Sequence, residues 1–140
     1  MRDYLFRGKR KDNGEWVEGC GIIATENWVS IFTVIDDIDE NSSEVNEIEV
    51  LPSTVGQYTG LTDKNGKKIF EGDIIKYKNT DGIKFNGVAL TVIGKVVYNE
   101  KNASFAISGK DEIGAKHYDY FPIKKIEVIG NIHDNPELLK

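Results

Sequence analysis

Short stretches in which apolar and polar residues alternate recur along the whole chain. The clearest is 104–108, where Phe105 and Ile107 stand two positions apart and share one face of an extended strand. Residues 28–35 are rich in β-branched and aromatic side chains, which favour strands. About ten such stretches, with almost no helical periodicity, predict a mainly-β fold.

Two Asn-Gly pairs separate strand-like stretches and indicate tight hairpins. They are Asn13-Gly14 and Asn65-Gly66. An Asn-Gly pair favours a type I′ turn, in which both central residues take a positive φ, so we expect this turn at both places. The residues that follow the first pair, 15–23, are expected to form one continuous strand.

The second half of the chain alternates between short strands and bends. From Gly56 onward we expect five strongly bent strands, with a one-turn helix at 122–125 before the last of them. Residues 79–86 are polar and are expected to form an exposed loop, whereas Gly94, inside the longest apolar stretch, indicates a bulge or a bend. This pattern is typical of a small, partly open barrel of the SH3-like type.

These patterns divide the chain into two parts. Residues 1–55 are expected to form a β-hairpin and meander region that includes an acidic loop at 36–47. Residues 56–140 are expected to form the SH3-like barrel, with very little helix. Near the end of the chain, Asn135 is placed to cap a short helical turn that starts at Pro136.

Length and composition describe an ordinary globular protein. The chain has 140 residues, of which 39% are hydrophobic and 29% are charged, and this balance excludes a disordered chain. No apolar run reaches the ~18 residues that a membrane helix needs, and the start lacks a secretory signal. The single cysteine, Cys20, cannot form an intrachain disulfide, which fits a reducing compartment. We therefore expect a cytoplasmic protein without membrane contact.

Charge is distributed unevenly. The chain carries 18 Lys and Arg against 23 Asp and Glu, for a net charge of -5. Residues 36–49 hold seven of these acids and no Lys or Arg, whereas residues 1–11 hold five basic residues and one acid. The acidic stretch is interpreted as a solvated connector, with contact to a basic partner as the alternative. A chain this acidic overall is a poor candidate for a general nucleic-acid binder.

The chain lacks the clustered residues that common active sites need. Its two histidines, His117 and His133, stand far from Cys20 in the sequence. Cys20 lies between two glycines in a strand-like run, where a small buried thiol is the usual state. The stretch 63–66 resembles a calcium loop loosely, but a hairpin turn accounts for it. We expect no catalytic residue, no cofactor and no metal site, and hence no enzymatic activity.

The basic start of the chain supplies the candidate binding surface. Cations near aromatic side chains combine charge that neutralises phosphates with surface on which bases stack. The candidate residues are Arg7, Lys9, Arg10, Lys11 and Trp16. The alternative interpretation is a solvated hairpin turn with buried aromatic residues, and the acidity of the chain favours it.

Three blocks of the sequence resemble the YopX family of phage and prophage proteins. The longest covers residues 55–75 and reads VGQYTGLTDKNGKKIFEGDII; the others lie at 6–17 and 128–139. The resemblance implies a mainly-β protein with an SH3-like barrel in its second half, encoded by a bacteriophage or prophage and acting inside a bacterial host. It implies no activity and no catalytic residues.

Two hypotheses about function follow. The first is a non-enzymatic interaction protein that engages a host or phage protein through its β surfaces, with self-association into a homo-oligomer as one form of this. The second is a nucleic-acid-binding accessory factor that uses the basic N-terminal hairpin.

Overall fold

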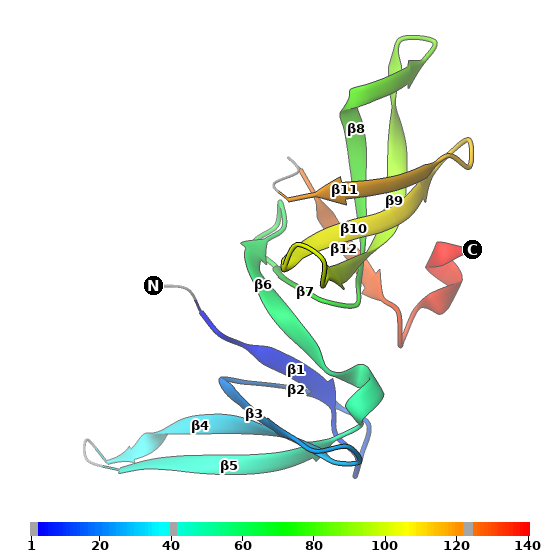
Figure 1. Ribbon diagram of the computed structural model, residues 1–140. Coiled ribbons are helices and arrows are strands. Elements are labelled where there is room, and N and C mark those ends of the chain that lie inside the picture. The colour runs from blue at the N-terminus through cyan, green and yellow to red at the C-terminus, as the bar shows by residue number, and fades with distance from the viewer. Residues whose placement is uncertain (1–2, 40–41, 122–124) are drawn as a thin grey trace. The chain divides into compact units, whose positions relative to one another are not determined.

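The computed structural model describes residues 3–39, 42–121 and 125–140, with only the backbone for residues 35–39, 42–43, 81 and 83 (Figure 1). The described residues form twelve β-strands and two short 3-10 helices, and they contain no α-helix. The mainly-β prediction is confirmed. The chain divides into two compact units, Met1–Gly60 and Leu61–Lys140.

The first unit contains the three-stranded antiparallel sheet with the order β3-β4-β5, and the antiparallel pairs that β1 forms with β2 and with β6. The boundary between the units falls within β6. The elements up to the boundary are β1 (Phe6–Lys9), β2 (Trp16–Gly19), β3 (Gly21–Ala24), β4 (Val29–Asp39), β5 (Ser42–Val50), the 3-10 helix η1 (Pro52–Thr54) and β6 (Gly56–Thr62).

The core of the first unit forms where two strands approach each other closely. Val29, Ile31 and Val50 are buried in it. A Cβ atom on Gly19 would overlap the backbone oxygen of Phe32 and would lie 2.5 Å from the Ile31 side chain. Because only glycine permits this approach, the sequence Gly19-Cys20-Gly21 bends and the expected single strand at 15–23 is two strands, β2 and β3.

The first hairpin is present, but its turn is not of type I′. Four residues separate Arg10 from Glu15, and the Gly14 N–H donates to the Arg10 carbonyl at 2.9 Å. Gly14 has a φ of 73°, whereas Asn13 does not have a positive φ. The Asn13 side chain instead accepts a hydrogen bond from the Glu15 N–H at 2.9 Å, which stabilises the turn without a left-handed asparagine.

The prediction that residues 36–47 form an acidic loop is wrong. Strands β4 and β5 run through most of it and pair down to Asp39 opposite Ser42, while residues 40–41 lie outside the described residues. Acidic residues at 44 and 47 stand exposed on β5. The strands form because β-branched residues such as Val34 and Val45 pair across the hairpin, and charge on its solvated side does not prevent this.

The second unit is built around one five-stranded antiparallel sheet. Its order is β11-β10-β9-β8-β12, and the described residues do not close it into a barrel. In this sheet β8, the first of the five strands along the chain, therefore lies between the second strand, β9, and the last strand, β12. The elements are β7 (Lys68–Phe70), β8 (Asp73–Phe85), β9 (Val88–Asn99), β10 (Ser104–Asp111), β11 (Lys116–Tyr120), β12 (Glu127–Asn131) and the 3-10 helix η2 (Pro136–Leu139).

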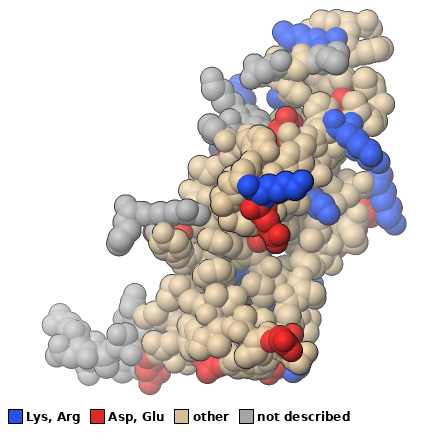
Figure 2. Space-filling model, in the orientation of Figure 1, with Lys and Arg blue, Asp and Glu red and all other residues tan. Residues whose placement is uncertain are grey.

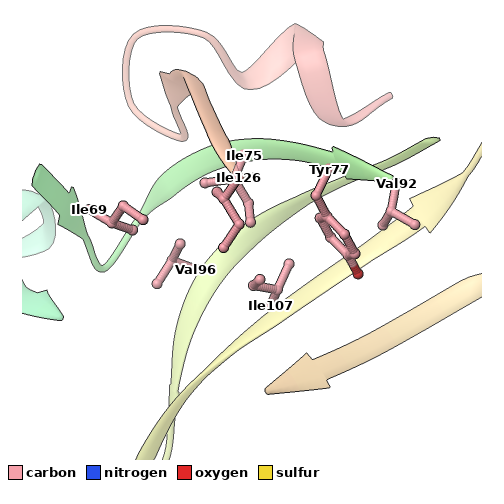
Figure 3. Packing of buried hydrophobic residues seen from close by; sticks show 7 residues of the cluster. All are labelled: Ile69, Ile75, Tyr77, Val92, Val96, Ile107 and Ile126. Atoms are coloured by element: carbon pink, nitrogen blue, oxygen red, sulfur yellow. The ribbon is translucent and has the colours of Figure 1, made fainter. Parts of the chain in front are cut away.

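One face of this bent sheet covers the core of the second unit. The Tyr77 ring packs in the cluster, with its hydroxyl group directed out of it (Figure 3). Phe105 and Val128 pack against the cluster from its rim. The buried members are Ile69, Ile75, Tyr77, Val92, Val96, Ile107 and Ile126. The prediction that Phe105 and Ile107 share the core face is confirmed.

The prediction that residues 79–86 form an exposed loop is also wrong. Strand β8 continues to Phe85 and pairs with β9, with a shift of register between Asn79 and Lys84. The hairpin closes at Asn86 and Gly87, whose φ values of 51° and 78° are those of a type I′ turn.

Of the two helical turns predicted near the end of the chain, the structure describes only the one at Pro136. The turn expected at 122–125 falls largely on residues 122–124, which lie outside the described residues. The turn at Pro136 is present as η2, but Asn135 does not cap it with its side chain. The Asn135 side chain accepts instead from the Asn131 N–H at 3.3 Å, which closes the turn after β12.

Candidate functional site

The basic start brings three of the five candidate residues together. Arg7 and Lys9 alternate along β1, so both point to the same side as Trp16, which is paired with Lys9 on β2. The Arg7 Cζ atom lies 4.9 Å and the Lys9 Nζ atom 5.6 Å from the centre of the Trp16 ring. Two cations therefore share the face of one half-buried indole, a contact that favours an ordered surface.

The other two candidate cations are paired with carboxylates. The Arg10 guanidinium donates to both oxygens of Asp12, at 3.0 Å and 2.7 Å. The Lys11 Nζ atom lies 2.6 Å from Glu49 Oε1. The hydrogen bond with Arg10 holds the pKa of the Asp12 carboxyl below its usual range. These pairs remove most of the positive charge that the sequence places at this turn.

The surface around Arg10 and Lys11 is accordingly of mixed charge. A shallow hollow of about 350 Å³ is lined there by Arg10, Lys11, Asp12 and the stretch from Glu47 to Glu49. A polyanion approaching this hollow meets three carboxylates beside two cations, so simple phosphate attraction is weak here. The role of the five candidate residues in binding stays a prediction.

A second candidate surface lies on the five-stranded sheet, on the face opposite its core. A groove of about 850 Å³ opens there between the strands β9, β10 and β11 and the helix η2. Its floor includes Ile93, Leu138 and Leu139, and its polar lining includes Ser108 and Tyr118. Four lysines complete the lining: Lys95, Lys110, Lys116 and Lys140. We call these four residues with the floor the lysine groove.

Strand register explains why three of the four lysines meet, whereas Lys140 follows the helix η2. Lys110 stands directly opposite Lys116 in the β10–β11 pair, and Ser108 stands opposite Lys95 in the β9–β10 pair. All of these positions fall on the face away from the buried Val92, Val96 and Ile107. The sequence scatters these lysines over more than forty positions, so a search for charge runs does not find them. The pairing of β9, β10 and β11 brings three of them together, and η2 adds Lys140.

In Figure 2 Lys and Arg side chains run down the side of the second unit where Figure 1 places the β10–β11 turn and the C-terminus. The carboxylates that line the lysine groove are Asp111 and Glu112. Asp111 is buried and accepts hydrogen bonds within the fold, so the exposed charge of the groove is mainly positive.

A histidine with two carboxylate neighbours lies at the edge of the core. The His117 Nε2 atom lies 2.8 Å from Asp111 Oδ2, and its Nδ1 atom lies 3.8 Å from Asp119 Oδ2. The Asn79 amide nitrogen is 3.4 Å from His117 Nδ1. Both ring nitrogens of His117 therefore have a polar neighbour inside the fold.

The same network continues to the core tyrosine. The Tyr77 hydroxyl donates to Asp119. Burial, and then the hydrogen bond to Asp119, raise the pKa of Tyr77 far above its usual value, so the phenol stays protonated. The network thus links β8, β10 and β11 through polar groups whose hydrogen bonds are made inside the fold, which is the arrangement of a structural contact.

The arrangement offers little chemistry for catalysis. The ring contacts of His117 go to Asp111, Asp119 and Asn79, and none of these is an activated nucleophile of the serine or cysteine type. Cys20 is exposed, contrary to the buried thiol that its neighbours favour, and its Sγ atom lies 3.8 Å from the Phe32 carbonyl. Within the described part of the chain, no three His, Cys, Asp or Glu side chains gather as metal ligands.

Two comparisons with known proteins find similar proteins. The family model described as "YopX protein" matches residues 5–140. The chain belongs to the YopX family. This YopX family member is also similar to the protein of the crystal structure titled "Crystal structure of protein EF1440 from Enterococcus faecalis", with 22% identity over 100% of each chain and a TM-score of 0.56. That similarity shows a shared fold alone.

A search of curated proteins for relatives of this YopX family member finds no match. Among its described residues, no helix is long and apolar enough to cross a membrane.

Proposed function

We propose that this YopX family member is a phage- or prophage-encoded, non-enzymatic protein that acts in the bacterial cytoplasm by binding another protein. The observation that carries the proposal is the β8–β9 hairpin, which extends beyond the other strands of its sheet (Figure 1). At its tip Phe85 stands opposite Val88, and their side chains are 58% and 60% exposed.

An apolar pair at the tip of a hairpin has a physical consequence. Leaving an aromatic ring in water forgoes burial that stabilises by roughly 1.5–3 kcal/mol, so a protein gains nothing in its own fold from such a side chain. The type I′ turn at Asn86 and Gly87 holds the two strands in register and fixes the position of both side chains. An exposed apolar tip of this kind fits an apolar pocket on a partner.

We further infer that the second unit is of the SH3-like type, with its barrel left open. Its first strand, β8, lies between the second strand, β9, and the last strand, β12, which is the order of a five-stranded SH3-like meander. Such units hold loops and hairpins on a rigid frame, which suits a binding protein.

The test is affinity capture from phage-infected or prophage-induced cells with a tagged protein. We expect a recurrent protein partner with the unchanged chain, and its loss with Phe85→Asp. Ile113→Asp is the matched control because Ile113 is 59% exposed in the β10–β11 turn of the same unit. The proposal is contradicted when Phe85→Asp captures the same partner, or when nuclease treatment removes every partner.

Self-association is the second form of this proposal, because Phe85 and Val88 could meet the same pair on another copy. Sedimentation at high protein concentration distinguishes it: a homo-oligomer through the tip becomes a monomer with Phe85→Asp, and a strict monomer throughout contradicts self-association.

Nucleic-acid binding through the basic hairpin stays a prediction with narrower support. Arg7 and Lys9 on the ring of Trp16 favour it, and the pairing of Arg10 with Asp12 and of Lys11 with Glu49 counts against it. Substituting Arg7→Gln and Lys9→Gln together weakens binding if this surface is used, and leaves it unchanged otherwise.

A further inference from the structure

We propose that the lysine groove of the second unit binds single-stranded nucleic acid through its phosphates and independently of base sequence. This site is separate from the hairpin tip that carries the proposed function, and it differs from the basic N-terminal hairpin that the sequence indicates. It takes a single strand of DNA or RNA as its ligand.

The first argument is unbalanced charge. Lys95, Lys110, Lys116 and Lys140 are all exposed, and none of them forms an ion pair with any described residue. Elsewhere in the same unit, Lys64 and Lys76 both pair with Glu127, at 2.9 Å and 3.5 Å. Lys64 and Lys76 thus have a carboxylate partner, whereas the four groove lysines form no ion pair with the described residues although Glu112 also lines the groove.

The second argument is the position of Lys110 relative to Lys116. The two residues stand directly opposite each other in the β10–β11 pair. Side chains so placed start from Cβ atoms about 5 Å apart, and like charges at this position destabilise a sheet. A phosphate group bound between the two ammonium groups would relieve this repulsion, since it adds negative charge at the point where positive charge is concentrated.

The third argument is an aromatic platform beside the lysines. Tyr118 lines the groove, and Tyr120 follows on the same side of β11. The rings are 47% and 49% exposed and meet edge to face, with their centres 5.7 Å apart. Unpaired bases stack on exposed aromatic rings next to a basic groove, whereas the bases of a duplex are already stacked on each other. This favours a single strand over a duplex.

The type of cation in the groove indicates which part of the ligand is recognised. The arginines of the chain are Arg2, Arg7 and Arg10, so the second unit has none. Arginine is the usual residue for two-pronged contacts to guanine or to a carboxylate, whereas lysine acts as a point charge toward phosphate. A lysine-only groove with tyrosines thus fits a phosphate backbone read without sequence preference, and fits an acidic protein segment less well.

The test measures the binding of a fluorescein-labelled oligo(dT) of about 15 nucleotides, a length within the range that small single-strand binding domains cover. Anisotropy is recorded as salt is raised from about 20 mM. We expect binding that weakens with salt, and a slope of log K against log salt that becomes shallower by about 1.4 in Lys110→Gln/Lys116→Gln, because each phosphate contact to a single strand contributes about 0.7.

Matched variants separate the groove from general charge. Lys84→Gln/Lys101→Gln removes two exposed lysines of the same unit that lie outside the groove, and we expect its slope to stay closer to that of the unchanged chain. Tyr118→Ala should weaken binding roughly five-fold or more with little change in slope, and Tyr118→Phe should restore it. All of these side chains are exposed, and circular dichroism checks that each variant is folded.

The proposal is overturned by any of three results. They are no binding at the lowest salt, equal loss in the control and groove variants, and competition by polyglutamate as strong as that by oligo(dT) at equal charge. Phe85→Asp should bind the oligonucleotide as the unchanged chain does, so a failure of this proposal and a failure of the proposed function are seen in different variants.

Discussion

The Val128 N–H donates to the Oδ2 atom of Asp63 at 3.0 Å, which ties the last strand of the chain to a turn sixty-five residues earlier. The other oxygen of Asp63 accepts from the N–H groups of Asn65 and Lys67, at 2.8 Å and 2.9 Å. One buried carboxylate thus holds both the hairpin between β6 and β7 and the start of β12. Burial alone would raise the pKa of Asp63, but the hydrogen bonds from Val128, Lys67 and Asn65 outweigh it, and the pKa is lowered.

Replacing Asp63 should destabilise the second unit. Asp63→Ala removes the acceptor of three backbone N–H groups, and we expect a loss of about 3 kcal/mol in the free energy of unfolding. Asp63→Asn keeps an oxygen for the turn but loses the acceptor for Val128, so its effect should be smaller. Urea unfolding followed by far-UV circular dichroism measures both, and faster hydrogen exchange at the Val128 amide should accompany them. Equal stability of Asp63→Ala and the unchanged chain would contradict this role.

Asp111 stabilises the β10–β11 turn in the same way as Asp63 stabilises the β6–β7 turn, by accepting hydrogen bonds from two backbone N–H groups of the turn. Its Oδ1 atom accepts from the N–H groups of Ile113 and Ala115, and its Oδ2 atom faces His117. In both turns the glycine at the third position after the aspartate has a positive φ, 80° at Gly66 and 84° at Gly114. The hydrogen bond with His117 is the largest influence on Asp111 and, with the backbone bonds, keeps its pKa below the usual range against the effect of burial.

The second unit should therefore lose stability in acid. A carboxylate whose pKa is lower in the folded chain stabilises the fold at pH values above its unfolded pKa of about 4, and this contribution disappears as the pH falls through the lower folded value. We expect the urea midpoint of this unit to be constant from about pH 5 upward and to fall below about pH 4. Asp111→Asn should flatten this fall, and a fall as steep as that of the unchanged chain contradicts the assignment.

Gly19 should be essential to the first unit, and its neighbour Gly21 should not. A methyl group at Gly19 overlaps the backbone of Phe32, so Gly19→Ala should destabilise this unit by about 3 kcal/mol through forced separation of the strands. A methyl group at Gly21 meets the Phe32 side chain at 3.6 Å, an ordinary contact, and should have little effect. Trp16 and Trp28 both lie in this unit, so tryptophan fluorescence during unfolding reports on it. Similar midpoints for the two variants would refute this.

Tyr77 should remain un-ionised while the protein is folded. Burial raises the pKa of its phenol, and the contact with Asp119 raises it further because a phenolate would face a carboxylate. In an alkaline titration followed by ultraviolet absorbance, we expect Tyr77 to ionise only together with unfolding, as a late step. Tyr77→Phe should remove the late step, and its persistence would show that another tyrosine causes it.

The strands were predictable where alternation and β-branched residues coincide, as in 104–108. Turn geometry was not. The Asn-Gly pairs at Asn13 and Asn65 predicted type I′ turns, but at both places a side chain that accepts backbone hydrogen bonds stabilises another turn. In the first turn this side chain is Asn13, and in the second it is Asp63. The type I′ turn is at Asn86, inside a stretch whose polar residues suggested a loop.

Gly94 was predicted to mark a bulge or a bend. The β9–β10 register runs through it without a shift, so the bulge is absent from this strand pair. A Cβ on Gly94 would lie 2.9 Å from the Cα of Gly109, its partner across the sheet. The glycine therefore permits close approach of two backbones, and a sequence without a known partner strand cannot reveal this.

The candidate surfaces were predictable in unequal measure. Local charge placed Arg7, Lys9 and Trp16 together correctly, because strand alternation acts over a few residues. It could not anticipate that Lys11 reaches Glu49 or that Lys95 and Lys116 line one groove, because both depend on pairing between distant strands.

Strand β11 ends the five-stranded sheet, so one row of its backbone groups has no neighbour within the sheet order. Such a border is where copies of a protein can add to one another and grow into fibrils. Lys116 stands at the beginning of this border, and a second copy aligned in parallel would bring two ammonium groups together. Because lysine on an edge strand opposes such pairing, we expect Lys116 to limit aggregation as well as to contact the proposed ligand.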